Sequence, residues 1–521
     1  MWFLAVAVAA LTLLTAIPYV AGPRLDDGSS AFLETLVFEQ DFNSYCAFVR
    51  QSAAGAWLFH NPFTPEPHRP IFLNLEFLVT GKAAAVLGLE AGAALQVQRA
   101  LVGVLWAVGL WGLCARMFTS LAMRRVALVA ALTGGGFGWM KVLPLLGAYV
   151  ARMRPADLNA GIHPFFWLFL HPHFLIGEAL VVLALWAVLE GERTGRTVFY
   201  LAAGALAAIA GLVRPYDMLF LQVVAVLFAA AIAIRERKVD WPAAARRLLP
   251  AIAPLPVLAY CVWLFRFDPV FQWWGRQGVN GPPPSPAMLL GLGLLTPLLV
   301  FALVAGRRRA WTRGEILMAC AAAASLALTY AYPWLRFSFQ FVTTLVVPTL
   351  LLAVARLEGS AGPIASSRRF RLLVAVLLAV HALTSVTLWA THLGEVRAGD
   401  HRIARSDLAV FSWLGAHSRP REVVLAGPRT SNRIPRYSHD AVVAGYEFST
   451  MRYAVRLEDV RRFYGASTPD ADRQRLLDEL RVRYVIHGPE ERQLGVYDPS
   501  RSAFLAEAFR DGPTVVFEVR R

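Results

Sequence analysis

Long apolar segments alternate with short arginine-rich segments over the first 390 residues of the chain. A membrane-crossing helix needs about 20 predominantly apolar residues. The pattern predicts eleven such spans, at roughly 2–20, 94–115, 126–147, 166–190, 197–213, 216–234, 248–266, 287–305, 314–332, 338–355 and 372–392. Ile71–Leu89 is also apolar, but Asn74, Glu76 and Lys82 interrupt it, which predicts a helix lying at the membrane surface.

The distribution of basic residues predicts the orientation of these spans. With the N-terminus in the cytoplasm, arginines concentrate in the inner loops, as in Arg307–Arg309 and Arg368–Arg369, as the positive-inside rule requires. The first loop (21–93) and everything after His392 then lie outside the cytoplasm. Counting Ile71–Leu89 as a further span would place every later loop on the opposite side of the membrane, and the excess of arginines would then lie outside.

The composition changes to that of a soluble domain at about Gly394. Apolar periods predict helices at 407–417, 457–464 and 470–482, and strands at 422–425, 441–445, 484–487 and 514–519. We therefore expect a mainly α membrane bundle over 1–393, which includes surface helices in its first outer loop, and a small extracytoplasmic α/β domain over 394–521.

Composition and charge support the membrane assignment. Hydrophobic residues make up 57% of the chain and the mean hydropathy is +0.49, above the range of soluble domains. The net charge of +15 comes from arginines between apolar segments, so topology explains it better than nucleic-acid binding. The four cysteines form no CxxC pair, so neither a disulfide framework nor a structural zinc site is predicted.

The first loop contains the leading candidate for a reactive group. If its start is helical, Val37, Asp41, Tyr45 and Phe48 share one face, so a carboxylate lies among apolar and aromatic groups. Such a carboxylate beside a membrane is costly unless it has a partner or a function. We predict Asp41 as the reactive group; the alternative is that Asp41 is only a surface acid in a long loop.

Histidines and arginines in the predicted outer loops are further candidates. His171 and His173 flank a helix start, where they can hydrogen-bond or, with an acid, hold a divalent metal; their spacing matches no specific metal motif. Arg214 either binds phosphate or is neutralised by Asp217. Arg336, among aromatic residues, either binds phosphate or reaches lipid headgroups.

A later predicted outer loop contains two tryptophans, Trp273 and Trp274, beside Arg276. They suit either stacking against a carbohydrate or the aromatic belt of a membrane protein, and the belt is the commoner case. No P-loop or dinucleotide-binding glycine motif occurs in a suitable context.

The layout resembles the GT-C superfamily of polytopic membrane glycosyltransferases, which includes protein O-mannosyltransferases, aminoarabinose transferases and bacterial lipopolysaccharide sugar transferases. An initial span is followed by a long outer loop with an early acid, and then by spans with arginine-rich inner turns such as Cys114-Ala115-Arg116. His68-Arg69-Pro70-Ile71-Phe72 is similar to the basic-Pro-apolar element that opens a surface helix in that superfamily.

The resemblance implies an inverting transfer of a sugar from a polyprenyl-phosphate carrier to an acceptor hydroxyl on a glycan, lipid or protein, at the outer face of a bacterial inner membrane. Asp41 would be the general base, and Glu39 or Glu66 the source of a second carboxylate where many members carry two adjacent acids. Arg336, Arg214 and Arg69 would bind the donor phosphate. The remaining implied substrate contacts are Tyr45, His171, His173 and Trp274.

No cofactor is expected, apart from the divalent metal considered above, and no nucleic-acid partner. Two rivals remain open: a transporter or lipid-handling scaffold without covalent chemistry, and a catalytically inactive relative that binds glycans. Transporters usually bury charges in mid-membrane and carry repeated halves, whereas here Glu178 is the main charge within a predicted span.

Overall fold

The computed structural model describes residues 2–159, 161–170, 172–277, 281–332, 334–361 and 367–520. The chain divides into two compact units. The first comprises Met1–Pro18, Val97–Cys261 and Asn280–Gly394, and the second comprises Tyr19–Gln96, Val262–Val279 and Glu395–Arg521. The first outer loop and the segment after Gly394 thus belong to one compact unit.

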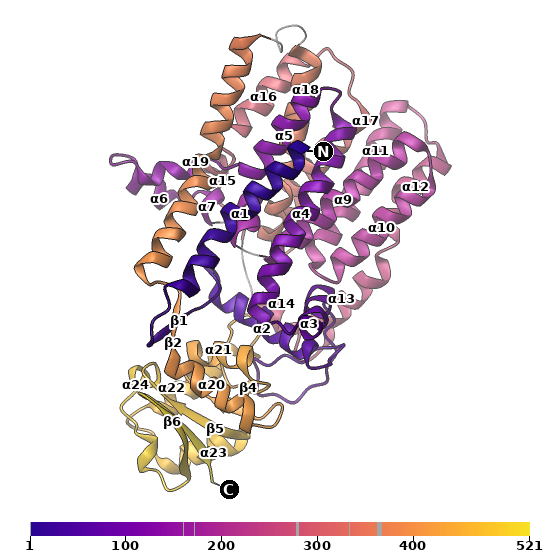
Figure 1. Cartoon of the computed structure of the whole chain (residues 1–521). Coiled ribbons are helices and arrows are strands. Elements are labelled where there is room, and N and C mark those ends of the chain that lie inside the picture. Colours follow the sequence, from indigo (N-terminus) through magenta and orange to yellow (C-terminus); the bar gives the residue numbers. More distant parts are fainter. Residues whose placement is uncertain are drawn as a thin grey trace. The chain divides into compact units, whose positions relative to one another are not determined.

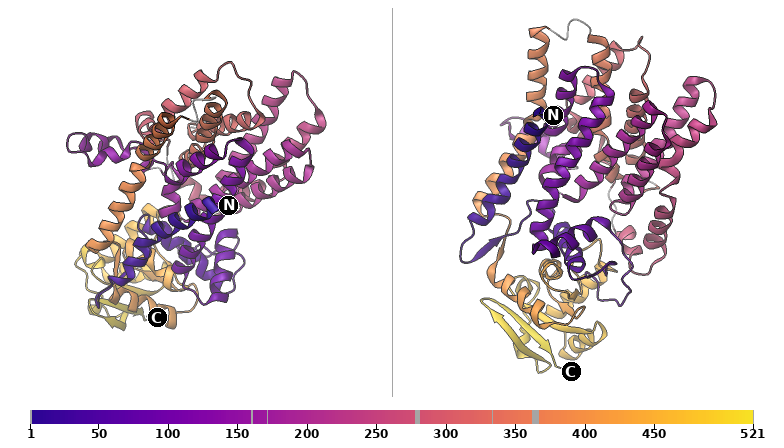
Figure 2. Two further views of the ribbon diagram at one scale, coloured as in Figure 1. Left: turned by 45° about the horizontal axis from the view of Figure 1, so that its top comes forward. Right: turned by 45° about the vertical axis from the view of Figure 1, so that its right-hand side comes forward.

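Helices make up the first unit. They are α1 (Trp2–Arg24), α4 (Ala91–Met117), α5 (Leu121–Thr133), η1 (Gly138–Val142), α6 (Gly147–Met153), α7 (Ala156–Asn159), α8 (Pro164–Leu170), α9 (Pro172–Thr194), α10 (Thr197–Gly211), α11 (Pro215–Glu236), α12 (Trp241–Ile252), α13 (Leu255–Phe267), α15 (Ser285–Leu292), α16 (Leu295–Ala305), α17 (Arg313–Thr329), η2 (Ser338–Thr344), α18 (Val346–Ala361) and α19 (Arg368–Ala398); α1, α4, α13 and α19 end or begin in the second unit. Helices α9, α10, α11 and α12 pack side by side (Figures 1 and 2).

The prediction of eleven spans is not confirmed. Among the described residues, seven helices are long and apolar enough to cross a membrane, or eight if α15 and α16, bent by 76°, count as one span. The predicted span 126–147 is not one helix: α5 ends at Thr133 and Gly134–Gly136 follow. A Cβ on Gly136 would lie 2.1 Å from the Gly291 carbonyl oxygen, so glycine permits a close approach of two backbones there. The predicted spans 197–213 and 314–332 are helices of only 15 and 17 residues.

The second unit contains a five-stranded sheet in the order β4-β3-β5-β7-β6. Strands β4 (Ala441–Val442), β3 (Val423–Leu425) and β5 (Val482–His487) are parallel to one another. Strand β7 (Thr514–Val519) pairs antiparallel with β5 on one side and with β6 (Leu505–Asp511) on the other. The other elements of the unit are β1 (Ser30–Phe32), α2 (Glu39–Ala53), α3 (Leu75–Leu87), α14 (Gln272–Gln277), β2 (Arg402–Ala404), α20 (Arg405–His417), α21 (Pro428–Tyr437), α22 (Tyr453–Tyr464), α23 (Asp470–Glu479), α24 (Glu491–Leu494) and η4 (Pro499–Arg501).

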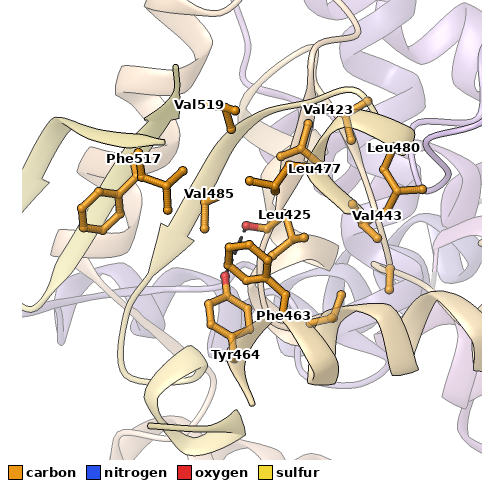
Figure 3. Close-up of a cluster of buried hydrophobic side chains, with 14 of the residues drawn as sticks. Val423, Leu425, Val443, Phe463, Tyr464, Leu477, Leu480, Val485, Phe517 and Val519 are labelled. Carbon is orange, nitrogen blue, oxygen red and sulfur yellow. Dashed lines mark hydrogen bonds between the residues drawn. The ribbon is translucent and has the colours of Figure 1, made fainter. Parts of the chain in front are cut away.

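Alternate strand residues face two hydrophobic cores, because successive side chains of a strand point to opposite faces. Leu425 and Val485 pack with Phe463 of α22 and Leu477 of α23 in one core (Figure 3). On the opposite face, Val424 and Ile486 pack with residues of α20 and α21, and Leu33, Ala47 and Phe63 of the first loop join that core. The first loop therefore completes the core of the α/β fold.

The predicted α/β fold of the C-terminal region is confirmed, although α21 and β6 were not predicted. The predicted helix within 71–89 is also present: α3 has 13 residues, too few to cross a membrane. Its N-cap Asn74 accepts a hydrogen bond from the Phe77 N–H, and its position at a membrane surface stays a prediction.

Candidate active site

Asp41 lies in the first turn of α2, where the helix dipole favours a negative charge. Its side chain is half-buried, and the hydroxyl of Tyr446 donates a hydrogen bond to Asp41 Oδ1. One turn further along, Tyr45 stacks on Phe77 with ring centroids 5.3 Å apart, and Phe48 stacks on the same ring at 5.4 Å. Asp41, Tyr45 and Phe48 therefore share one face of α2 as predicted, but Val37, the fourth member of the predicted face, lies before the helix begins at Glu39.

Tyr446 belongs to a turn that several contacts hold against the first loop. Thr450 Oγ1 accepts from the N–H of Tyr446 at 3.2 Å and donates to the Phe63 carbonyl at 2.6 Å. Asn61 Nδ2 donates to the Ser449 carbonyl at 2.7 Å. The Tyr446 ring meets Phe63 edge-on. The phenol is thus positioned from the C-terminal segment, 405 residues away from Asp41 in sequence.

The environment keeps Tyr446 a hydrogen-bond donor. Burial raises the pKa of the Tyr446 hydroxyl well above its ordinary value, and the negative charge of Asp41 raises this pKa further. The phenol therefore stays protonated at neutral pH and can donate to Asp41 throughout. Sequence reasoning missed this residue, because no local pattern links a tyrosine after β4 to an acid in the first loop.

Glu39 is paired with arginines of α21. Arg433 Nε lies 2.5 Å from Glu39 Oε1, and Arg429 lies 3.7 Å from Oε2. Burial would raise the pKa of Glu39, but the hydrogen bond from Arg433 and the charges of both arginines outweigh it and lower that pKa. Residues two apart on a helix do not face each other, so Glu39 and Asp41 point to different sides of α2.

Glu66 is held by Arg456 of α22. Arg456 Nη2 and Nε lie 2.6 and 3.1 Å from Glu66 Oε1, and Thr64 Oγ1 donates to Glu66 Oε2. Arg456 also contacts Asp459 at 3.0 Å. These pairs fasten the first loop to the C-terminal helices, so both candidate second acids have structural partners.

Trp274 of α14 lies in an aromatic cluster. Its ring contacts Phe72, Phe271 and Phe48, with centroids 5.0, 5.2 and 6.2 Å away. The indole N–H is buried and has no hydrogen-bond partner among the described residues. The candidate phosphate ligand Arg69 is exposed on the loop before α3.

Arg214 is a buried residue of the first unit. It precedes α11, is 2% exposed, and pairs with Asp217 at 3.2 Å and with Gln340 Oε1 at 3.2 Å. Its guanidinium also lies 4.1 Å from the centroid of the Phe174 ring. The sequence alternative in which Asp217 neutralises Arg214 therefore matches the ion pair seen here.

The other candidates of the first unit differ in exposure. Arg336 is exposed, between α17 and η2. His173 lies in the first turn of α9, and the predicted position His171 is outside the described residues. As potential metal ligands of the second unit, Glu395 Oε2 and His401 Nε2 lie 3.1 Å apart.

The apolar helices define an integral membrane protein in which the first loop and the C-terminal segment share an α/β unit around Asp41 and Tyr446. No protein-family model matches the chain, and no curated protein matches its sequence significantly.

Solved structures show which fold this is. The oligosaccharyltransferase of Archaeoglobus fulgidus aligns over 94% of this chain and 69% of its own, with a TM-score of 0.57 at 13% identity. ArnT from Cupriavidus metallidurans aligns over 98% of this chain and 97% of its own, with a TM-score of 0.50 at 15% identity. The arabinofuranosyltransferase AftD from Mycobacteria aligns over 99% of this chain and 40% of its own, with a TM-score of 0.57 at 15% identity. The chain has the GT-C fold, as its sequence layout predicts.

Proposed function

We propose that this protein is an integral-membrane glycosyltransferase that transfers a sugar from a polyprenyl-phosphate donor to an acceptor hydroxyl, with Asp41 as the general base. The observation that supports this most is the placement of Asp41: an acid at the start of the first loop helix, half-buried and hydrogen-bonded by Tyr446, in a chain with the GT-C fold. A carboxylate oriented by a permanent donor is suited to accept a proton in one fixed direction.

The reaction forms one bond and breaks another. The acceptor oxygen attacks the anomeric carbon while the bond from that carbon to the phosphate oxygen breaks, and the hydroxyl proton moves to Asp41. A single displacement inverts the configuration at the anomeric carbon. The polyprenyl phosphate leaves with its negative charge, which a nearby guanidinium would stabilise.

Three arginines remain candidates for that phosphate contact. The side chains of Arg336 and Arg69 are exposed, so a ligand can reach their guanidinium groups, whereas Arg214 is buried. We therefore rank Arg336 and Arg69 before Arg214. An archaeal oligosaccharyltransferase of this fold has been solved with an inhibitory peptide and a dolichol-phosphate, which supports a lipid-phosphate donor here.

The substrate contacts and location complete the proposal. Tyr45 and His173 would contact the sugar, together with His171 and Trp274 from the sequence analysis, and the acceptor is a glycan, lipid or protein. The loop charges support a cytoplasmic N-terminus and an extracytoplasmic C-terminal segment, and a bacterial inner membrane location follows from the family resemblance alone.

Sugar transfer in proteoliposomes tests this function. Wild type, Asp41→Asn and the control Asp472→Asn, an acid on α23, are supplied with polyprenyl-phosphate sugars and with glycan, lipid and protein acceptors, and the sugar remaining on the carrier is measured. We expect wild type and the control to consume donor and Asp41→Asn to leave it intact while folding normally. Equal donor consumption by Asp41→Asn would refute the role of Asp41.

One observation favours the transporter alternative. Within the first unit, Glu178 and Asp217, each 1% exposed, lie on membrane helices α9 and α11, and Arg214 lies at the start of α11. Buried charges in membrane helices often mark a substrate path. A transporter would move the lipid-linked sugar between leaflets without changing the carrier, so intact donor in all three proteoliposome samples would favour it.

A further inference from the structure

A cavity of about 330 Å³ lies within the second unit, at the far end of α2 from Asp41. Its wall includes the end of α2 (Gln51, Ala54), the loop with His60 and His68, and the His439-Asp440 pair that precedes β4. Ligand pockets for small molecules begin at about 300 Å³. Gln51 follows Asp41 by ten residues on one helix, which places the cavity about 15 Å from Asp41 along the helix axis.

Two residues of this wall each carry a buried polar atom that lacks a hydrogen-bond partner within the described part of the chain. Asp440 is fully buried; its Oδ2 accepts from Ser418 Oγ at 2.9 Å, but its Oδ1 has no partner. His60 Nδ1 is also buried and unpaired. Leaving a buried polar atom unpaired costs free energy, so both atoms favour a ligand that can hydrogen-bond.

The histidines of the cavity are uncharged at neutral pH. Burial and then the charge of Arg421 lower the pKa of His60 to about 4. Burial also lowers the pKa of His68 and of His439. A neutral imidazole has one donor and one acceptor nitrogen, a pattern that matches a hydroxyl group, which also donates and accepts.

The remaining groups argue against an ion. Charged groups of both signs surround the cavity: Asp440 is faced by Glu422 and Arg50 as well as by Ser418 and Ser438, and Arg421 and Glu66 line the wall, so neither an anion nor a cation would meet only opposite charges. A metal would need three ligands close together, and among the described residues the cavity's histidine and carboxylate atoms form no group of three within 4.8 Å. Proline rings, including Pro62 and Pro420, supply apolar wall suited to the C–H face of a sugar.

We propose that this cavity binds one uncharged sugar unit, with Asp440 Oδ1 and His60 Nδ1 as hydrogen-bonding atoms. That the sugar is part of an acceptor glycan whose reacting hydroxyl lies near Asp41 rests on the proposed function. Binding energy from such a remote unit would help to position the reacting hydroxyl.

Binding of simple sugars to the purified full chain tests this site. The probes are the methyl glycosides of glucose, mannose, galactose and arabinose. Their binding is measured by titration calorimetry in detergent. We expect at least one to bind with a millimolar Kd, and Asp440→Asn to weaken that binding about tenfold or more. Ala54→Leu, which fills the cavity without removing a polar group, should abolish binding, and Ala471→Leu on α23 should preserve it.

Several results would overturn the proposal. They are binding of none of the four glycosides, unchanged binding in a folded Ala54→Leu variant, or saturable uptake of inorganic phosphate or Zn²⁺ that Asp440→Asn abolishes. Asp41→Asn separates this site from the proposed function, because it should keep wild-type sugar binding. Sugar binding without any transfer by wild type would refute the function and leave the site intact.

Discussion

Replacing Tyr446 by phenylalanine removes one hydrogen bond to Asp41 and leaves the rest of the turn intact. The ring is held edge-on by Phe63 and Phe448, at 5.9 and 5.4 Å, and the backbone is fixed by Thr450, so phenylalanine can occupy the same place. The lost interaction joins a neutral donor to a carboxylate, which is worth roughly 1.5–3 kcal/mol.

That free energy sets the expected size of the effect. A loss of about 1.4 kcal/mol in transition-state stabilisation is tenfold in rate. We expect kcat of Tyr446→Phe to fall about tenfold or more, with KM within about twofold, because the phenol positions the base and not the substrate.

The assay is donor-to-acceptor transfer by proteoliposomes at saturating donor and acceptor. Tyr497→Phe is the matched control: it removes a phenol that hydrogen-bonds to Ser502 instead of Asp41, and should leave kcat unchanged. A folded Tyr446→Phe variant with wild-type kcat would refute the reasoning that Tyr446 positions the base.

Three further predictions concern the surrounding groups. Glu39→Gln and Glu66→Gln should lower the melting temperature while kcat falls less than about fivefold, since arginines hold both acids; a loss as deep as that of Asp41→Asn would identify a second catalytic acid. Burial raises the pKa of Asp440 from its ordinary 3.8 to about 7, so the native state keeps a proton that the unfolded chain releases. Wild type should therefore lose stability relative to Asp440→Asn as pH rises from about 4 to about 7, by up to roughly 4 kcal/mol. A difference in melting temperature between the two proteins that does not change with pH would contradict this. EDTA should change turnover less than about twofold, because arginines already hold Glu39 and Glu66 and the carboxylate of Asp41 alone is a poor site for a divalent cation. A loss of turnover that added metal reverses would establish a metal requirement.

Local patterns account for what could be predicted from sequence. The helical period placed Asp41, Tyr45 and Phe48 on one face of α2, and alternation of apolar residues located β3, β5 and β7. These features depend on neighbours a few residues away, which a sequence displays directly.

Features set by distant contacts could not be predicted. Helix α21 is polar and contains Pro435, so its pattern favours a loop, yet its arginines bind acids of the first loop. The apolar run over 126–147 looks like one span, but the backbone of Gly291 approaches Gly136 and the helix ends before it. Tyr446 reaches Asp41 only because the first loop and the C-terminal segment fold as one unit.

The most direct test of the central claim is the turnover number of Asp41→Asn relative to wild type, measured on folded protein with one lipid-linked sugar and one acceptor. A general base contributes about 10²- to 10⁴-fold to rate. We therefore predict a loss of at least about a hundredfold, with donor binding retained. A turnover within about twofold of wild type would contradict the assignment of Asp41 as the base.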